Sequence, residues 1–209
     1  PTVSKVVVDL LESGLLEEGA APDNTVGRPG KKIQLARDGA QVIGIVLDQH
    51  TCVVLAASLD GQIDGERTST FATPGTYDAL LNHLTEFVQR FNEDTTSQTL
   101  GVGISTPGLV DEEYERCLFS PNLQIINHQT PAVDLTKRTG LESICFQETK
   151  ALCMAERLYG NARGLDDFAM MDMSTGLGLG VFSGGELLTG HNGLAGELGH
   201  ITVDPTGKL

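Results

Sequence analysis

A carboxylate and an imidazole stand three residues apart near the end of the chain, at Glu197 and His200. On a helical turn this spacing places both side chains on one face. The pair closes a glycine-rich segment, residues 175–200. Glycine inside a strand or helix costs about 0.5–1 kcal/mol relative to alanine, and packing alone does not require it so often. We therefore expect backbone close to a bound ligand, or turns with positive φ, at Gly176, Gly178, Gly180, Gly184, Gly185, Gly190, Gly193, Gly196 and Gly199.

This segment resembles the signature of the ROK family, named for repressors, open reading frames and sugar kinases. Further segments carry the resemblance in the right order over nearly the whole chain, namely Pro1-Thr-Val-Ser-Lys5, Gly27-Arg-Pro-Gly30, residues 101–111 and Ser120-Pro-Asn-Leu123. The resemblance implies an α/β protein with a truncated actin-like ATPase fold, preceded by part of a winged helix-turn-helix. It leaves two classes open, a sugar kinase and a DNA-binding regulator that senses a sugar.

The hairpin after the first predicted strand of this fold distinguishes the two classes. Kinases of the family carry an aspartate and glycines there, so that backbone N–H groups can approach the ATP phosphates. This chain has Val46-Leu-Asp-Gln-His-Thr51 instead. The side chains of Asp48 and Gln49 occupy the approach path, and the Asp48 carboxylate repels a phosphate. Because phosphoryl transfer depends on positioning and charge neutralisation, this hairpin disfavours a kinase.

The catalytic base is the second distinguishing feature. ROK kinases place an Asn-Asp pair at the start of the helix that begins the second lobe, and the Asp accepts the proton of the sugar hydroxyl. The matching residues here are Gln147 and Glu148. Glutamate has a longer side chain, and a misplacement of about 1 Å can slow a reaction about 10²-fold. The pair therefore suits hydrogen bonding to a sugar, and Glu148 is catalytic only if the protein is a kinase.

The resemblance also implies the other sugar-site residues. Glu197 would bind sugar hydroxyls, Gly108 and Asn122 would close the pocket from the first lobe, and Asn122 could equally cap a turn. His200 would approach the sugar and, in a longer protein, bind a structural zinc ion. One imidazole cannot hold tetrahedral zinc, which takes four ligands. We expect no cofactor in this chain and zinc only in a full-length protein; a histidine satisfied by local hydrogen bonds is the alternative.

The first residues predict an amphipathic helix, because apolar side chains recur at helical spacing from Val3 to Leu11. Thr2, Ser4 and Lys5 stand near its start. In a winged helix-turn-helix the second helix enters the major groove, and its N-terminal residues contact base edges. These three residues are therefore candidates for DNA binding, and a packing helix with a polar cap is the alternative.

A basic strip follows the helix. Residues 26–37 carry four positive charges and no negative one, and Arg28 and Lys31 are among the basic residues. The whole chain has a net charge of −14, which taken alone speaks against nucleic acid. A locally basic strip on an acidic protein is compatible with phosphate contact, so Arg28 and Lys31 are DNA-binding candidates. A solvated hairpin is the alternative.

Composition excludes several other classes. Forty per cent of the residues are hydrophobic and few are aromatic, as in a globular α/β protein. No apolar run reaches the length of about 18 residues that spans a membrane, and we expect no secretion signal. The four cysteines have irregular spacing, which favours buried thiols in a reducing compartment such as the cytoplasm.

Strands alternating with helices predict layered α/β architecture. We expect a partial winged helix-turn-helix with recognition helix and wing over residues 1–37, a first ROK lobe over 38–145 and the start of a second over 146–209. Pro1 is not an initiator methionine, so we interpret the chain as a fragment without the start of the winged helix and without the zinc loop. Within the lobes the patterns predict strands near 41–47, 52–59, 100–105 and 168–173, and helices near 77–91 and 148–159.

The favoured hypothesis is a ROK transcriptional regulator of the NagC/XylR type, repressor-like, that binds operator DNA and a sugar or sugar phosphate. We expect a homodimer or higher homo-oligomer in which the effector closes the two lobes. Two alternatives stay open. One is a ROK sugar kinase that phosphorylates a hexose or amino sugar with ATP. The other is a sugar-binding regulator that acts through a protein partner.

Overall fold

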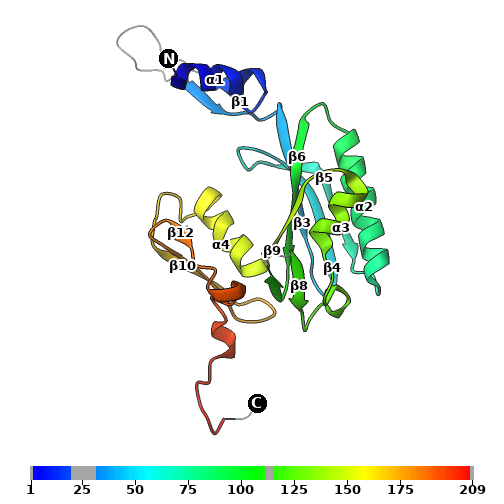
Figure 1. The fold of residues 1–209 in the computed structure, drawn as a ribbon, viewed down its shortest axis with the longest axis vertical. Helices are drawn as coiled ribbons and strands as arrows, with labels where there is room; N and C mark the ends of the chain where they lie inside the picture. The colour runs from blue at the N-terminus through cyan, green and yellow to red at the C-terminus, as the bar shows by residue number, and fades with distance from the viewer. Residues whose placement is uncertain (1, 20–31, 112–114, 208–209) are drawn as a thin grey trace.

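The computed structural model describes residues 2–19, 32–111 and 115–207 (Figure 1). At the N-terminal end, helix α1 (Thr2–Glu12) is followed by strands β1 (Leu16–Gly19) and β2 (Lys32–Leu35), which pair antiparallel. We refer to α1, β1 and β2 as the N-terminal unit. The predicted helix is confirmed. Arg28 and Lys31 lie outside the described residues.

The main sheet has the strand order β5-β4-β3-β6-β9. Its β3–β4 and β4–β5 pairs are antiparallel, whereas β6 runs parallel to both β3 and β9. The carboxyl ends of β3, β6 and β9 therefore lie at one edge of the sheet, where ligands bind in open α/β folds. The five strands are β3 (Ala40–Val46), β4 (Thr51–Ser58), β5 (Ile63–Ala72), β6 (Gln98–Thr106) and β9 (Ser143–Gln147).

Helices cover the two faces of this sheet unequally (Figure 1). Helices α2 (Tyr77–Glu93) and α3 (Pro131–Thr139) lie together on one face, and α4 (Glu148–Tyr159) lies on the other side. Helix α4 packs on a second antiparallel sheet, β10 (Phe168–Asp172), β11 (Gly178–Ser183) and β12 (Glu186–Leu187). The hairpin of β7 (Leu109–Asp111) and β8 (Arg116–Phe119) and the short helices η1 (Gln124–Ile126), η2 (His191–Gly193) and η3 (Leu198–His200) complete the described fold.

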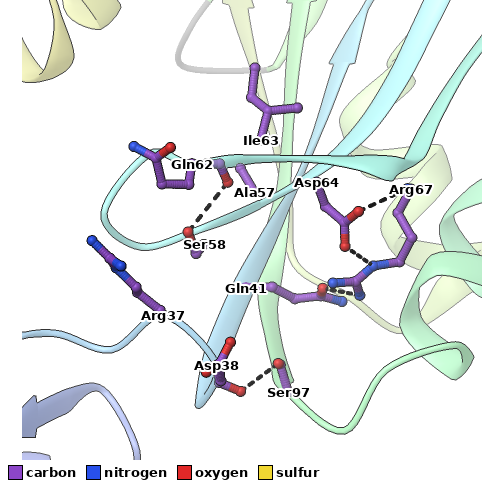
Figure 2. Close-up of a pocket in the computed structure, with 10 residues that line it drawn as sticks. All are labelled: Arg37, Asp38, Gln41, Ala57, Ser58, Gln62, Ile63, Asp64, Arg67 and Ser97. Atoms are coloured by element: carbon purple, nitrogen blue, oxygen red, sulfur yellow. Dashed lines mark hydrogen bonds and ion pairs between the residues drawn. The ribbon is translucent and has the colours of Figure 1, made fainter.

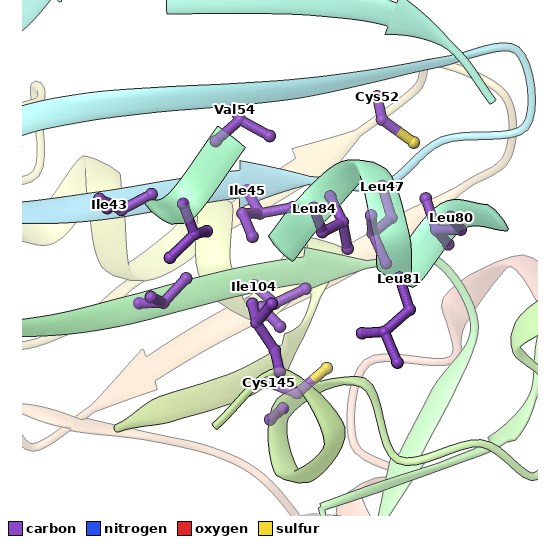
Figure 3. Packing of buried hydrophobic residues seen from close by; sticks show 14 of the residues in the cluster. Ile43, Ile45, Leu47, Cys52, Val54, Leu80, Leu81, Leu84, Ile104 and Cys145 are labelled. Carbon is purple, nitrogen blue, oxygen red and sulfur yellow. The ribbon is translucent and has the colours of Figure 1, made fainter. Parts of the chain in front are cut away.

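The hydrophobic core lies between the main sheet and helices α2 and α3 (Figure 3). Ile45 of β3 lies beside Leu84 of α2 there, and the side chains of Ile43, Ile45 and Leu84 are at most 1% exposed. The neighbouring β3 residues Val42 and Val46 are 36% and 37% exposed. The nearly continuous apolar run at residues 41–47 is typical of a strand buried on both faces, but β3 is buried on one face only, the face that α2 and α3 cover.

All four cysteines are buried and free, as predicted. Cys52, Cys117 and Cys145 belong to the core cluster, and Cys153 lies on α4. The predicted strands and helices of both lobes are present, with ends that differ from the predicted ones by a few residues. The domain boundaries at residues 37 and 145 stay predictions.

The N-terminal unit meets the first lobe through a backbone contact between two glycines. Gly14 ends the turn after α1 with φ +72°, and the unit returns to the lobe at Gly39, just before β3. A Cβ atom added at Gly39 would overlap the carbonyl oxygen of Gly14. The Leu15 carbonyl accepts a hydrogen bond from the Ala36 N–H at 3.0 Å nearby. The unit is therefore held close to the sheet where no side chain fits.

We expect Gly39→Ala to displace the N-terminal unit from the lobe. Relieving such an overlap costs about 1–3 kcal/mol. We expect it to destabilise the contact between Gly14 and Gly39 and to leave the hydrophobic core unchanged. Limited proteolysis should cleave the variant faster between the unit and the lobe, with an unchanged unfolding temperature of the lobe. Gly65→Ala is the matched control, since a Cβ there meets nothing within 4 Å. Equal cleavage of Gly39→Ala and wild type would contradict the prediction.

Candidate ligand-binding site

A cavity of about 470 Å³ lies at the carboxyl ends of the parallel strands β6 and β9. Five of the six residues predicted to bind sugar line it: Gly108, Gln147, Glu148, Glu197 and His200. Their joint placement follows from topology, because Thr106 at the end of β6 pairs with Gln147 at the end of β9. The remaining wall comes from α4, the end of β10, the glycine-rich segment with the residue before it, and the β7–β8 hairpin region, namely Leu109, Phe119, Pro121, Thr149, Asp172, Ser174, Thr175, Gly176, Leu177, Gly178 and Gly196.

Gly108 occupies a position at which no side chain fits. Its φ is +92°, which side chains rarely tolerate, and an added Cβ would overlap the carbonyl oxygen of Phe119. The β6 strand can therefore turn sharply into the β7–β8 hairpin at the mouth of the cavity. Asn122 is exposed and is not among the lining residues, although its neighbour Pro121 is.

The two halves of the cavity are joined by a hydrogen bond across 50 residues of sequence. The Gln147 side-chain amide donates to Glu197 Oε1 at 3.0 Å. The other oxygen, Glu197 Oε2, lies 3.6 Å from His200 Nε2. The expected proximity of Glu197 and His200 is confirmed, on the 3₁₀ turn η3. The His200 side chain is 83% exposed, so one side of the imidazole faces solvent.

Packing explains some of the glycines that were expected to serve a ligand. A Cβ at Gly178 would overlap Thr149 Oγ1, and one at Gly180 would lie 2.5 Å from the Cβ of Cys153. Glycine at these positions lets β11 lie directly against α4. The expectation that packing does not require them is therefore wrong for Gly178 and Gly180. The expected positive φ occurs later in the segment, for example at Gly196, where φ is +90°.

Carboxylates dominate the electrostatics of the cavity. Burial raises the pKa of Glu148, and the negative charges of Asp172 and Asp48 raise it further. Asp172 ends strand β10 and accepts hydrogen bonds from the Ser174 N–H and hydroxyl. Sequence reasoning missed Asp172; an acid at a strand end just before the glycine-rich segment was the available signal. The cavity thus gathers negative charge around Glu148.

The β3–β4 hairpin keeps its own polar groups occupied. Asp48 Oδ1 accepts a hydrogen bond from the His50 N–H at 3.1 Å, and the Asp48 carbonyl accepts one from the Thr73 hydroxyl at 2.7 Å. An N–H group that a glycine hairpin would offer to an anion is therefore bound to a carboxylate. The Asp48 carboxylate also raises the pKa of Glu148, so its negative charge contributes to the electrostatics of the cavity.

A second cavity of about 470 Å³ lies near the N-terminal unit and is lined by polar side chains (Figure 2). Arg67 binds Asp64 through Nε at 2.7 Å and also contacts the buried Gln41. Gln41 in turn donates to Thr99 at 2.8 Å. These polar groups bind one another, which is typical of a structural network rather than of an open ligand site.

The DNA-binding candidates on α1 lie outside this cavity, whereas the metal candidate His200 lines it. Thr2, Ser4 and Lys5 are exposed in the first turn of α1. His200 is the zinc candidate, and among the described residues no three His, Cys, Asp or Glu side chains come together to hold a metal ion. Zinc binding by His200 in a longer protein stays a prediction. No helix in the described ranges has the length and apolar character needed to cross a membrane.

Comparison with known proteins identifies the family. A sequence profile of the ROK family matches residues 42–209. The chain therefore belongs to the ROK family, and its α/β architecture is the actin-like fold of that family. It is 26% identical, over 99% of its length and 51% of the relative's, to the DNA-binding transcriptional dual regulator NagC of Escherichia coli. It is 31% identical to a glucokinase of Thermotoga maritima, over 81% of this chain and 53% of the relative.

A crystal structure of another ROK family member has a similar fold. A ROK family transcriptional regulator, a homologue of the E. coli MLC protein, superposes with a TM-score of 0.81 at 26% identity. The match covers 99% of this chain and 53% of that one, and so includes the N-terminal unit. The chain spans about half the length of the curated relatives it matches.

The raised pKa of Glu148 predicts how stability depends on pH. The folded protein binds this proton more tightly than the unfolded chain, so stability falls as pH rises from the ordinary glutamate pKa, about 4.3, through the folded-state value. We expect the Glu148→Gln variant to be more stable than the wild type at neutral pH. This difference in stability should disappear below the ordinary glutamate pKa of about 4.3. Urea unfolding at several pH values measures the effect.

Glu142→Gln is the matched control, because Glu142 is an exposed glutamate outside the cavity. It should leave the pH dependence of unfolding close to that of the wild type. A neutral-pH stability of Glu148→Gln equal to or below that of the wild type would contradict the prediction.

Proposed function

We propose that the protein is a sugar-responsive, DNA-binding transcriptional regulator of the ROK family, repressor-like in its action. The observation that carries this proposal is the β3–β4 hairpin, whose His50 N–H is taken by the Asp48 carboxylate at 3.1 Å. A triphosphate approaching this hairpin would meet a negative charge in place of free N–H donors. Both regulators and kinases are among the relatives, so the hairpin is the feature that favours a receptor.

The sugar effector binds in the cavity at the carboxyl ends of β6 and β9. Gln147, Glu148, Glu197 and His200 offer donors and acceptors for hydroxyl groups, with Gly108 at the mouth. Asn122 adds a contact from the cavity margin when the lobes close. Because the polar groups come from both sides of the cavity, a sugar that binds them all favours the closed arrangement.

Operator DNA binds to the N-terminal unit. The first turn of α1 exposes Thr2, Ser4 and Lys5, and a helix N-terminus favours phosphate. Arg28 and Lys31 contribute phosphate contacts from the basic strip. The regulator acts in the cytoplasm as a homodimer or higher homo-oligomer, and the full-length protein holds a structural zinc ion through His200 and further ligands. Sugar binding shifts the population between two arrangements of the DNA-bound assembly.

Operator binding tests the proposal directly. The full-length protein should select a specific duplex from a random pool, and a cognate sugar should change its affinity for that duplex. Lys5→Ala should weaken binding to all sequences and lower the salt slope by about 1, since one phosphate contact is lost. Lys137→Ala on α3, a 71% exposed lysine side chain in the first lobe, is the control. Absence of specific DNA binding with every sugar tried would refute the regulator.

The carboxylates of the cavity predict the charge of the effector. Glu148, Asp172 and Glu197 line it, and Asp48 acts on it from the hairpin. We expect an unphosphorylated sugar to bind more tightly than its phosphate, because like charges repel in a partly buried site. Calorimetric titration with each sugar and with its phosphate measures the difference between the two affinities. Asp172→Asn should reduce this difference in affinity, whereas Glu142→Gln should leave it unchanged. Tighter binding of the phosphate would contradict this prediction.

One observation favours the kinase alternative. Glu148 keeps a carboxylate at the start of α4, and its raised pKa suits a proton acceptor. ATP-dependent phosphorylation of a hexose or amino sugar that disappears in Glu148→Gln would establish this alternative. A regulator that acts through a protein partner would instead bind with little dependence on salt.

A further inference from the structure

Helix α4 connects the sugar cavity to the surroundings of the N-terminal unit. It begins at Glu148, which lines the cavity, and ends at Tyr159. Its 12 residues span about 18 Å at 1.5 Å per residue. Because its backbone is hydrogen-bonded internally, a helix of this length moves as a rigid rod. A displacement of Glu148 therefore moves Tyr159 as well.

The far end of α4 rests on the turn between β4 and β5. The Tyr159 ring lies so close to Gly61 that a Cβ there would be 2.5 Å from its Cδ1 atom. Gly61 has φ +85°, so the turn itself also favours glycine. Next to this contact, Leu158 and Tyr159 line a cavity of about 300 Å³ together with Leu35 of β2.

The same turn also binds the linker, residues 36–39, which joins β2 of the N-terminal unit to β3. Asp60 pairs with Arg37 Nε at 2.9 Å, and the Ser58 hydroxyl donates to Asp60 at 2.5 Å. Figure 2 shows Arg37 beside this turn. The Arg37 backbone N–H donates to the carboxylate of Glu17 on β1 at 3.3 Å. The turn is thus bound to α4 on one side and to the N-terminal unit on the other.

The contact at Tyr159 contributes little to stability. Leu158 and Tyr159 are 54% and 55% exposed, so they bury only part of their apolar surface. The Arg37–Asp60 pair is solvent-accessible, with the Arg37 side chain 65% exposed, and such pairs contribute about 0–1 kcal/mol. Contacts of this kind can be broken and remade at small cost, which a two-state element requires.

We propose that Tyr159, Gly61 and the Arg37–Asp60 pair form a relay that couples the sugar cavity to the orientation of the N-terminal unit. This inference rests on the proposed function. A sugar that draws Glu148 toward the first lobe shifts α4 along its axis, and Tyr159 then moves across the turn. The contact between Asp60 of this turn and Arg37 then changes, and α1 rotates relative to the sheet. Tyr159 and Asp60 are positioning residues that touch neither sugar nor DNA.

The test uses the full-length protein and compares operator affinity with and without saturating sugar. In Tyr159→Ala the sugar-induced change in operator affinity should shrink by about 2- to 30-fold, the range of single-residue effects on coupling. Sugar affinity without DNA and the unfolding temperature should stay at wild-type values, which separates a lost relay from a damaged fold. Asp60→Asn should have the same effect from the other side of the turn.

Tyr159→Phe should retain the coupling, because the ring makes the contact with Gly61. Leu152→Ala is the control on the same helix, at an exposed residue that lies outside the contacts of the turn. A responsive wild type with an equally responsive Tyr159→Ala would overturn the relay and leave the regulator intact. A wild type whose operator affinity ignores every sugar would contradict the regulator and the relay together.

Discussion

The site depends on the parallel pairing of β6 with β9. This pairing places Gly108, just after β6, next to Gln147 at the end of β9. Gln147 then binds Glu197 at 3.0 Å, which ties the glycine-rich segment to the main sheet. Each partner alone is an ordinary polar residue. Together they form a cavity wall whose two halves come from distant parts of the chain, so any ligand that binds both halves draws them together.

Charge decides what this cavity can accept. A kinase of this fold has to stabilise phosphoryl oxygens, which takes cations and free N–H donors. The described residues instead gather Asp48, Glu148 and Asp172 in one region, and their mutual repulsion contributes to the raised pKa of Glu148. Carboxylates are good acceptors for sugar hydroxyls. The residues that replace the glycines of the β3–β4 hairpin thus disfavour nucleotide, and they leave the carboxylates proposed to bind sugar hydroxyls in place.

Much of the fold could be predicted from local patterns, because periodicity and turn residues act over a few positions. Burial on the second face of β3 could not, since it depends on which helices cover the sheet. The sequence predicts a nearby ligand or a positive φ at Gly178 and Gly180, but the close packing of β11 on α4 becomes visible only in three dimensions. Asp172 was not predicted, although its place at the end of a strand before the glycine-rich segment is a signal in the sequence. The residues gathered from motifs, such as Gln147 and Glu197, line the cavity together, whereas the exposed Asn122 does not line it.

The N-terminal unit and the cavity at the ends of β6 and β9 lie at opposite ends of the main sheet, so the proposed relay between them has to cross the domain. Strand β3 runs the whole way, but Ile43 and Ile45 are buried in a close-packed core that resists sliding. Helix α4 covers a similar distance with a half-exposed end at Tyr159. A rigid element with one end in the cavity and a weakly packed end at the linker moves at lower cost than a core strand. The unequal packing of the two faces of the sheet therefore favours α4 as the moving part of the proposed relay.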